Sequence, residues 1–201
     1  MAITTYANLQ TALSNWLKRS DLTSYLPDFV TIGETRIFRE ARTSDMETAL
    51  SVAIASGVAA LPTGYIDLKF AYVNASPTLR LKRRSASWIY ENYPTRSSDG
   101  KPSFIAREGT NFIFGPYPDS NYTITGVFYK NIGPLSSSAH ALFTANPDLY
   151  LFASLVAAEP FIKNDKRLVL WEAQYQRALE GANKVTRDED YSGGGLEVTP
   201  G

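Results

Sequence analysis

The sequence of 201 residues contains no cysteine and a single histidine, His140. Without cysteine the chain cannot form disulfides, thiolate nucleophiles, iron–sulfur clusters or thiolate zinc sites. One histidine also excludes a metal site built on a histidine pair. We therefore expect no cofactor and no metal centre.

Net charge and long apolar runs are also missing. Lys and Arg total 20, and so do Asp and Glu, so the formal net charge is zero. This balance argues against a protein that binds nucleic acid over its whole surface. No apolar run approaches the ~20 residues that span a bilayer. The first residues lack the basic segment and apolar stretch of a secretory signal. We expect no membrane partner.

Catalytic motifs are absent as well, so we expect no enzyme. No Gly-x-Ser-x-Gly accompanies His140, whose segment is typical of a loop or helix start. Asp188-Glu189-Asp190 lacks the glycine turn of a calcium loop. Because acidic residues oppose the dipole at a helix C-terminus, the last helix is expected to end before Asp188.

Helical periodicity marks both ends of the chain. Near the N-terminus, Thr4 or Thr5 can cap a first helix, and Pro27 suits the first turn of a second. The second helix is expected to turn Gly33 inward and Glu34 outward. Toward the C-terminus, Pro147 opens a third helix, Pro160 kinks or ends it, and Asp165 caps a fourth. The inner face of that fourth helix is predicted to hold Leu168, Trp171, Tyr175, Ala178, Leu179, Ala182 and Val185.

Between about residues 47 and 129 the pattern alternates as in strands. Leu50, Val52 and Ile54 share one face and Ser56-Gly57 makes a turn. Ile66, Leu68, Phe70 and Tyr72 are expected to share a face further on, and a local helix is expected over residues 85–93. Short strands with Gly and Pro between them are typical of an antiparallel sheet, a sandwich or a small barrel.

These patterns predict an α+β fold. The N- and C-terminal helix pairs are expected to form a four-helix bundle, with an antiparallel β domain inserted between them and a flexible C-terminal tail. The expected boundaries are 1–45 and 136–190 for the helix pairs, 46–135 for the β domain and 191–201 for the tail. Gly193-Gly194-Gly195 makes the tail flexible in isolation.

Charge is distributed unevenly along the neutral chain. Residues 69–107 contain eight basic and two acidic residues, which gives +6, so the rest carries −6. Residues 186–201 contain one basic and four acidic residues, which gives −3. Such asymmetry can orient subunits against each other. The cluster of Arg80, Lys82, Arg83 and Arg84 is a candidate inter-subunit or channel-facing surface, able to touch nucleic acid, or else an ordinary solvated strand.

Aromatic residues gather beside Pro and Gly in the same region. They are candidate interface anchors or core residues, or rings that stack on a sugar or base. The candidate interface aromatics are Trp88, Tyr90, Tyr93 and Tyr117.

Several segments, in this order and spacing, resemble the head–tail adaptors of tailed bacteriophages, the connector or tail tubular protein A type. They are Leu26 to Arg42, which runs from a proline to paired arginines, Leu61 to Leu68, Asn111 to Pro118, Tyr129 to Leu135, Asn146 to Leu151, and Trp171 to Leu179. The resemblance covers most of residues 5–185, and the family has no catalytic residues to transfer.

The resemblance implies a structural virion protein that forms a ring, usually of twelve copies, below the portal. The ring would extend the DNA channel and dock the tail nozzle or tube, so the expected partners are itself, portal protein, a tail protein and, transiently, packaged DNA. The expected location is the head–tail junction of the virion, after synthesis in the host bacterial cytoplasm.

The tail segment Leu196, Glu197, Val198 and Thr199 is a candidate for partner binding as an added strand. Two alternatives stay open. One is a virion module that binds carbohydrate or a host surface through the β domain, and the weaker one is a hydrolase that uses His140 or paired carboxylates.

Overall fold

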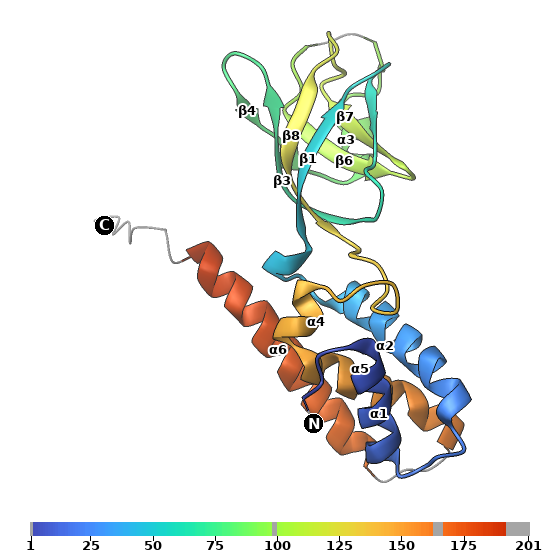
Figure 1. Cartoon of the computed structure of the whole chain (residues 1–201). Coiled ribbons are helices and arrows are strands. Elements are labelled where there is room, and N and C mark those ends of the chain that lie inside the picture. Colours follow the sequence, from blue (N-terminus) through green and yellow to red (C-terminus); the bar gives the residue numbers. More distant parts are fainter. Residues whose placement is uncertain (1, 98–99, 163–166, 192–201) are drawn as a thin grey trace, which may run out of the picture. The chain divides into compact units, whose positions relative to one another are not determined.

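The fold is α+β, as the sequence predicts. The computed structural model describes residues 2–97, 100–162 and 167–191 (Figure 1). The chain divides into two compact units, a helical unit of Met1–Met46 with Ile132–Gly201 and a β unit of Glu47–Asn131. The expected tail residues 192–201 and the expected cap Asp165 lie outside the described residues.

A threonine cap begins the first helix of the helical unit, and a proline begins the second. Thr5 Oγ1 accepts the Asn8 N–H at 3.1 Å at the start of the first helix, and Pro27 lies in the first turn of the second. The helices are α1 (Tyr6–Leu17), α2 (Leu26–Glu40), α4 (Ala141–Ala145), α5 (Pro147–Ile162) and α6 (Leu168–Tyr191), with short 3₁₀ turns η1 (Thr23–Tyr25) and η2 (Ser44–Met46).

Helix α5 lies at the centre of the helical unit. It packs against α1, α2 and α6 (Figure 1), so its central turns are buried around most of the helix rather than along one stripe. Its buried residues are Leu149, Tyr150, Leu151, Ala153, Ser154, Leu155 and Ala158. Pro160 stands inside α5, two residues before its end. The expected four-helix bundle is not confirmed in its details, because three helices surround one apolar helix.

Helices α2 and α5 approach each other most closely at Gly33. A Cβ atom at Gly33 would lie 2.9 Å from the backbone nitrogen of Ser154 and 3.2 Å from the Cβ of Ala153. Real side chains do not occupy such positions, so the backbones can meet here only because Gly33 has no side chain. Small residues on both helices therefore set the distance between them.

Glu34, expected on the outer face of α2, is buried. The residue is only 4 % exposed, and its Oε1 accepts a hydrogen bond from the backbone N–H of Leu135 at 2.7 Å. Burial raises the pKa of Glu34, and the hydrogen bond from Leu135 opposes that rise. The prediction was wrong because the segment after Ile132 returns over this side of α2 and covers it.

Two further charged residues of α2, Arg36 and Glu40, make contacts with α6. Arg36 donates two hydrogen bonds to the Glu172 carboxylate, at 2.6 and 2.7 Å, and its guanidinium lies 4.1 Å from the centre of the Tyr175 ring. Tyr175 donates to Glu40 at 2.8 Å. The paired guanidinium lowers the pKa of Glu172 to about 2. A charged seam thus joins two helices that are 136 residues apart in sequence.

Helix α6 continues past Asp188 to Tyr191, so the expectation that it ends earlier was wrong. Side-chain oxygens of Asn183 and Thr186 accept the backbone N–H groups of Arg42 and Ser44, both at 2.8 Å. These bonds hold α6 to the chain leaving α2. Val185, expected on the inner face, is 59 % exposed.

The β unit consists of two four-stranded sheets (Figure 1). The first has the order β1-β8-β3-β4 and is antiparallel. The second has the order β2-β7-β6-β5, in which β5 and β6 are parallel. The strands are β1 (Glu47–Ala53), β2 (Val58–Ala60), β3 (Tyr65–Asn74), β4 (Leu79–Arg80), β5 (Lys82–Arg83), β6 (Phe104–Glu108), β7 (Asn111–Gly115) and β8 (Thr123–Lys130), and helix α3 is Ala86–Asn92.

A short connection joins each edge strand of the first sheet to an edge strand of the second. Strand β1 turns into β2 through Ser56 and Gly57, whose φ angles of 51° and 76° suit a tight hairpin. Strand β4 continues into β5 through Leu81, whose N–H bonds to Ala71 of the first sheet, while the N–H of Lys82 bonds to Ser103 beside the second. The chain itself therefore links the two sheets at both of their edges, where unpaired strands would otherwise be open to other chains.

The core of the β unit lies between the sheets, and α3 adds a second layer. Ile89 of α3 packs with Ala106 and Ile113 on the outer face of the second sheet. Ser85 caps this helix by accepting the Trp88 N–H, as expected for a helix near residues 85–93. The residues between the sheets are Leu50, Ile54, Ala59, Leu68, Ala71, Val73, Leu81, Ile105, Phe112, Phe114, Ile124 and Phe128.

A bulge in β3 changes which of its residues face the core. Leu68 pairs with Phe128 and Phe70 with Val127, so the register shifts at Lys69. Leu68, Ala71 and Val73 enter the core, whereas Phe70 and Tyr72 lie on the opposite face with their ring centres 5.6 Å apart. The expectation that Leu68, Phe70 and Tyr72 share one face was wrong, because one extra residue reverses the alternation that follows it.

The close approach at Gly33 predicts opposite outcomes for two glycine substitutions. Gly181→Ala in α6, where a Cβ would meet no atom within 4 Å, should raise the free energy of unfolding by up to about 1 kcal/mol through helix propensity. Gly33→Ala should lower it by about 1–3 kcal/mol through overpacking. Urea unfolding followed by circular dichroism measures both. Equal stabilisation by both substitutions would contradict the constraint.

The buried carboxyl predicts a pH-dependent effect of Glu34→Gln. A pKa raised by folding gives stability that is present below the unfolded value and is lost as pH rises through the folded value. Gln keeps an acceptor for Leu135 without a charge, so its unfolding free energy should exceed that of the wild type near neutral pH. This advantage should shrink below the usual glutamate pKa of about 4.3.

Glu34→Ala serves as the contrast in the same experiment. It leaves the Leu135 N–H without an acceptor and should be less stable than Glu34→Gln by about 1–3 kcal/mol. A Gln variant less stable than wild type at neutral pH would show that the charge of Glu34 is favourable in the fold.

Candidate interaction surface

The basic cluster lies where the chain passes from one sheet of the β unit to the other. We call residues 79–84 the basic crossover. Leu81 is buried between the sheets, and its neighbours Arg80 and Lys82 are exposed. The alternation follows from the extended backbone, in which successive side chains point to opposite faces.

The cations of the basic crossover differ in what they contact. Arg83 pairs with Asp67 at 2.6 Å and donates to the carbonyl of Leu68 at 2.7 Å. Arg84 lies over the rings of Trp88 and Phe104, at 5.2 and 5.6 Å from their centres. Arg83 and Arg84 therefore help to hold the β unit together, and neither is simply solvated.

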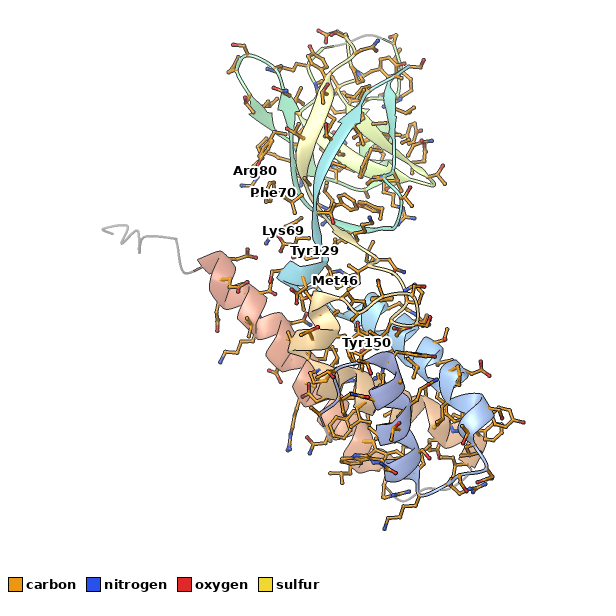
Figure 2. The ribbon with its side chains drawn as sticks, viewed as in Figure 1. Met46, Lys69, Phe70, Arg80, Tyr129 and Tyr150 are labelled. Carbon is orange, nitrogen blue, oxygen red and sulfur yellow. The ribbon has the colours of Figure 1, made fainter. Side chains whose placement is uncertain are left out.

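The side chains of Arg80 and Lys82 make no hydrogen bond or ion pair with any residue that the structure describes. With Phe70 they line a groove of about 430 Å³ along β3, β4 and β5. Among the residues that the structure describes, none that lines the groove is acidic; the lining is Lys69, Phe70, Arg80, Leu81, Lys82 and Arg83. Figure 2 shows Arg80, Phe70 and Lys69 along one side of the β unit. Lys69 is paired with Glu47 at 2.7 Å.

A smaller hollow of about 190 Å³ lies on the other side of Arg83. Arg83, Arg84 and Arg107 line it together with Tyr65 and the N-cap Ser85. Arg107 lies over the Tyr65 ring and donates to the carbonyl of Gly109. The basic surface thus continues from the groove to β6.

Two of the predicted interface aromatics contact other rings within the chain. Trp88 packs on Phe104 with ring centres 4.7 Å apart, and Tyr93 lies 6.2 Å from both. A Cβ at Gly115 would lie 2.7 Å from the Tyr93 ring. These contacts hold α3 and the chain after it onto β6 and β7.

The other two predicted aromatics lie on either side of Arg96. The Arg96 guanidinium is 5.6 Å from the centre of the Tyr90 ring and 5.0 Å from that of Tyr117, and it donates to the Phe114 carbonyl at 2.9 Å. Tyr90 also donates to Glu108. All four predicted aromatics therefore make contacts inside the β unit.

The sequence analysis missed the outer face of the first sheet. Phe70 and Tyr72 lie there because of the bulge at Lys69, and their strand partners are Val127 and Thr125 of β8. Arg80 pairs with Tyr72 at the β4 edge. Among the described residues of the β unit, no element packs over this face, whereas α3 covers the outer face of the other sheet. Only the register shift, which sequence periodicity does not show, could have revealed it.

His140 is the cap of a short helix. Its Nδ1 accepts the Phe143 N–H at 3.4 Å at the start of α4, and its Nε2 lies 3.4 Å from the Tyr150 hydroxyl. Burial lowers the pKa of His140. The expected position at a helix start is confirmed.

The structure does not test the C-terminal candidate residues, but it does allow a search for membrane-spanning helices. The candidate tail residues Leu196, Glu197, Val198 and Thr199 lie outside the described residues. Across residues 2–97, 100–162 and 167–191, no helix combines the length and the apolar character needed to cross a membrane.

Because Arg83 makes contacts within the β unit and the side chains of Arg80 and Lys82 do not, we expect their substitution by alanine to change the stability of the fold unequally. Arg83→Ala removes the pair with Asp67 and the bond to the Leu68 carbonyl, and should lower the free energy of unfolding by about 1 kcal/mol. Arg80→Ala and Lys82→Ala should change it by less than about 0.5 kcal/mol. Thermal unfolding of the three variants side by side tests this. Equal losses in all three would show that Arg80 and Lys82 also make contacts that stabilise the fold.

Comparison with known proteins agrees with the resemblance seen in the sequence. A family model described as SU10 adaptor protein matches residues 4–198, which span both units. No curated protein matches the chain. The match covers nearly the whole chain, and the family is one of phage head–tail adaptors rather than of enzymes. The chain therefore belongs to the SU10 adaptor protein family and is a structural adaptor of a tailed-phage virion.

Proposed function

We propose that the protein forms a ring below the portal, where it extends the DNA channel and docks the tail. Its partners would be further copies of itself, twelve in the family pattern, the portal protein and the tail nozzle or tube protein. Packaged DNA would touch the channel only transiently. The site of action would be the head–tail junction, after synthesis in the host bacterial cytoplasm.

The observation that carries this proposal is a basic groove and an uncovered sheet face in a chain of a structural adaptor family. The side chains of Arg80 and Lys82 make no hydrogen bond or ion pair among the described residues, and Phe70 and Tyr72 lie on a face that no element of the β unit covers. Within the β unit, both features are left without a covering element. Contacts with other chains would bury them, as in interfaces that combine aromatic and cationic residues.

A ring also needs subunits that meet head to tail. Such contacts join two different patches and close when the rotation between copies divides a full turn. The split of charge between residues 69–107 and the C-terminal end supplies two different patches. A channel of neutral subunits with local charges also avoids a strong hold on the passing DNA.

The C-terminal segment is our candidate for docking on the portal or on a neighbouring subunit. Leu196 and Val198 alternate with Glu197 and Thr199, so an added strand would turn the two apolar residues to one side. The segment begins just after α6, which ends at Tyr191. The four-helix bundle and the flexible tail remain part of this proposal.

The carbohydrate-binding alternative has less support. Stacking on a sugar requires open aromatic faces, but Trp88, Tyr93 and Tyr117 contact other rings or Arg96 within the chain. The hydrolase alternative has no family support, since the matching family is structural.

The tail proposal predicts a face-specific effect on docking to portal particles. Leu196→Asp with Val198→Asp should abolish co-sedimentation with portal particles, as should truncation after Tyr191. Glu197→Ala with Thr199→Ala is the matched control and should bind like the wild type, because those residues point away from the added strand's apolar side. Equal binding by truncated and full chains would contradict the tail's role. Absence of rings on portal particles for the wild type would contradict the function itself.

A further inference from the structure

The groove beside the basic crossover has a specific chemistry. Phe70 supplies an aromatic surface, and Lys69, Arg80, Lys82 and Arg83 border it without any carboxylate in the lining. Two of these cations already have acidic partners, Glu47 and Asp67. The groove therefore offers an apolar surface and two cations, Arg80 and Lys82, to whatever binds there.

We propose that this groove binds the C-terminal end of α6 from a second copy of the chain. The inference rests on the proposed ring, and it names the two surfaces that meet in each contact between neighbouring copies. One surface belongs to the β unit and the other to the helical unit, so the contact is heterologous and can repeat around a ring.

The end of α6 has the complementary chemistry. Val185 is 59 % exposed, and Asp188 and Glu189 follow it at the i+3 and i+4 positions, which lie on the same helix face. Thr186 is buried, and residues 187–190 are all exposed. An exposed apolar side chain bordered by two carboxylates matches an aromatic ring bordered by two cations.

The helix dipole gives a second reason for a cationic partner. Carboxylates near a helix C-terminus face the partial negative charge of the last carbonyl groups, which is an unfavourable arrangement. The final turn of α6 nevertheless carries Asp188, Glu189 and Asp190. Arg80 and Lys82 of a neighbour would offset both the carboxylates and the dipole.

A protein partner accounts for the groove better than DNA does. The sheet face beside the groove is aromatic and aliphatic, with Phe70, Tyr72 and Val127, and does not extend the basic charge. Lys and Arg neutralise the phosphates in nucleic-acid complexes, and two of the four cations that border the groove, Lys69 and Arg83, already neutralise carboxylates. The chain is also neutral overall and carries the acidic complement itself.

Charge reversal tests the contact in the full chain, assembled on portal particles. Arg80→Glu with Lys82→Glu places acid against acid, and Asp188→Lys with Glu189→Lys places base against base. Each double variant should raise the concentration needed for ring formation by at least about tenfold. The chain with all four substitutions restores opposite charges, and should form rings at nearly the wild-type concentration.

Circular dichroism checks that the variants fold. We expect them to fold, because the side chains of Arg80 and Lys82 make no hydrogen bond or ion pair among the described residues and lysine suits a helix C-terminus. Glu91→Lys with Asp119→Lys, at exposed positions of the β unit outside the groove, is the matched control for a change of net charge and should assemble normally. Particles are counted by electron microscopy and weighed by mass photometry.

Introduced cysteines give a direct test, since the chain has none of its own. Lys82→Cys with Asp188→Cys in the assembled ring should form a ladder of cross-linked copies under oxidation, whereas Glu91→Cys with Asp188→Cys should not. Cross-linking only within single chains would overturn the proposal.

The outcomes separate this inference from the function. Rings that form equally well in all charge-reversed variants would overturn the contact and leave the adaptor function in place. Loss of DNA binding with unchanged ring assembly would assign the groove to DNA instead. Failure of the wild type to form rings with portal particles would overturn the proposed function, and the contact with it.

Discussion

The close approach of α2 and α5 at Gly33 is the constraint on which the helical unit depends. A Cβ at Gly33 would lie 2.9 Å from the Ser154 backbone nitrogen, so only glycine permits this spacing. The two helices come from opposite sides of the β insertion, and their contact brings the two halves of the unit together. Helices α1 and α6 then cover what remains of α5, whose apolar surface extends all the way round.

Polar groups fix how the chain enters and leaves this helical core. Glu34 accepts the Leu135 N–H on the returning segment, while Asn183 and Thr186 accept N–H groups of the segment leaving α2. Buried polar atoms are costly unless paired, so each bond specifies one path of the chain. Within the β unit, Glu47 at the start of β1 pairs with Tyr129 near the end of β8, so the insertion begins and ends at neighbouring strands.

The basic region serves structure and interaction together. Arg83, Arg84, Arg96 and Arg107 lie against carboxylates, carbonyls or rings of the same unit, whereas Arg80 and Lys82 do not. A positive charge count over residues 69–107 therefore overstates the charge that a partner can meet. The smaller set that remains lies beside an aromatic sheet face, and this combination favours another protein as the partner.

The sequence by itself determined the α+β class, a cap at Thr4 or Thr5, the local helix near residues 85–93, the turn at Ser56 and Gly57, and the adaptor family, because these depend on local chemistry and on the order of motifs. Only the tertiary structure decided the burial of Glu34, the charged seam of Arg36 with Glu172, and the outward position of Phe70 and Tyr72. Burial of Glu34 depends on a segment about 100 residues away, which periodicity within one helix cannot detect. A one-residue bulge at Lys69 reverses the faces of β3, and hydrogen-bond register between strands, rather than composition, decides where such a bulge falls.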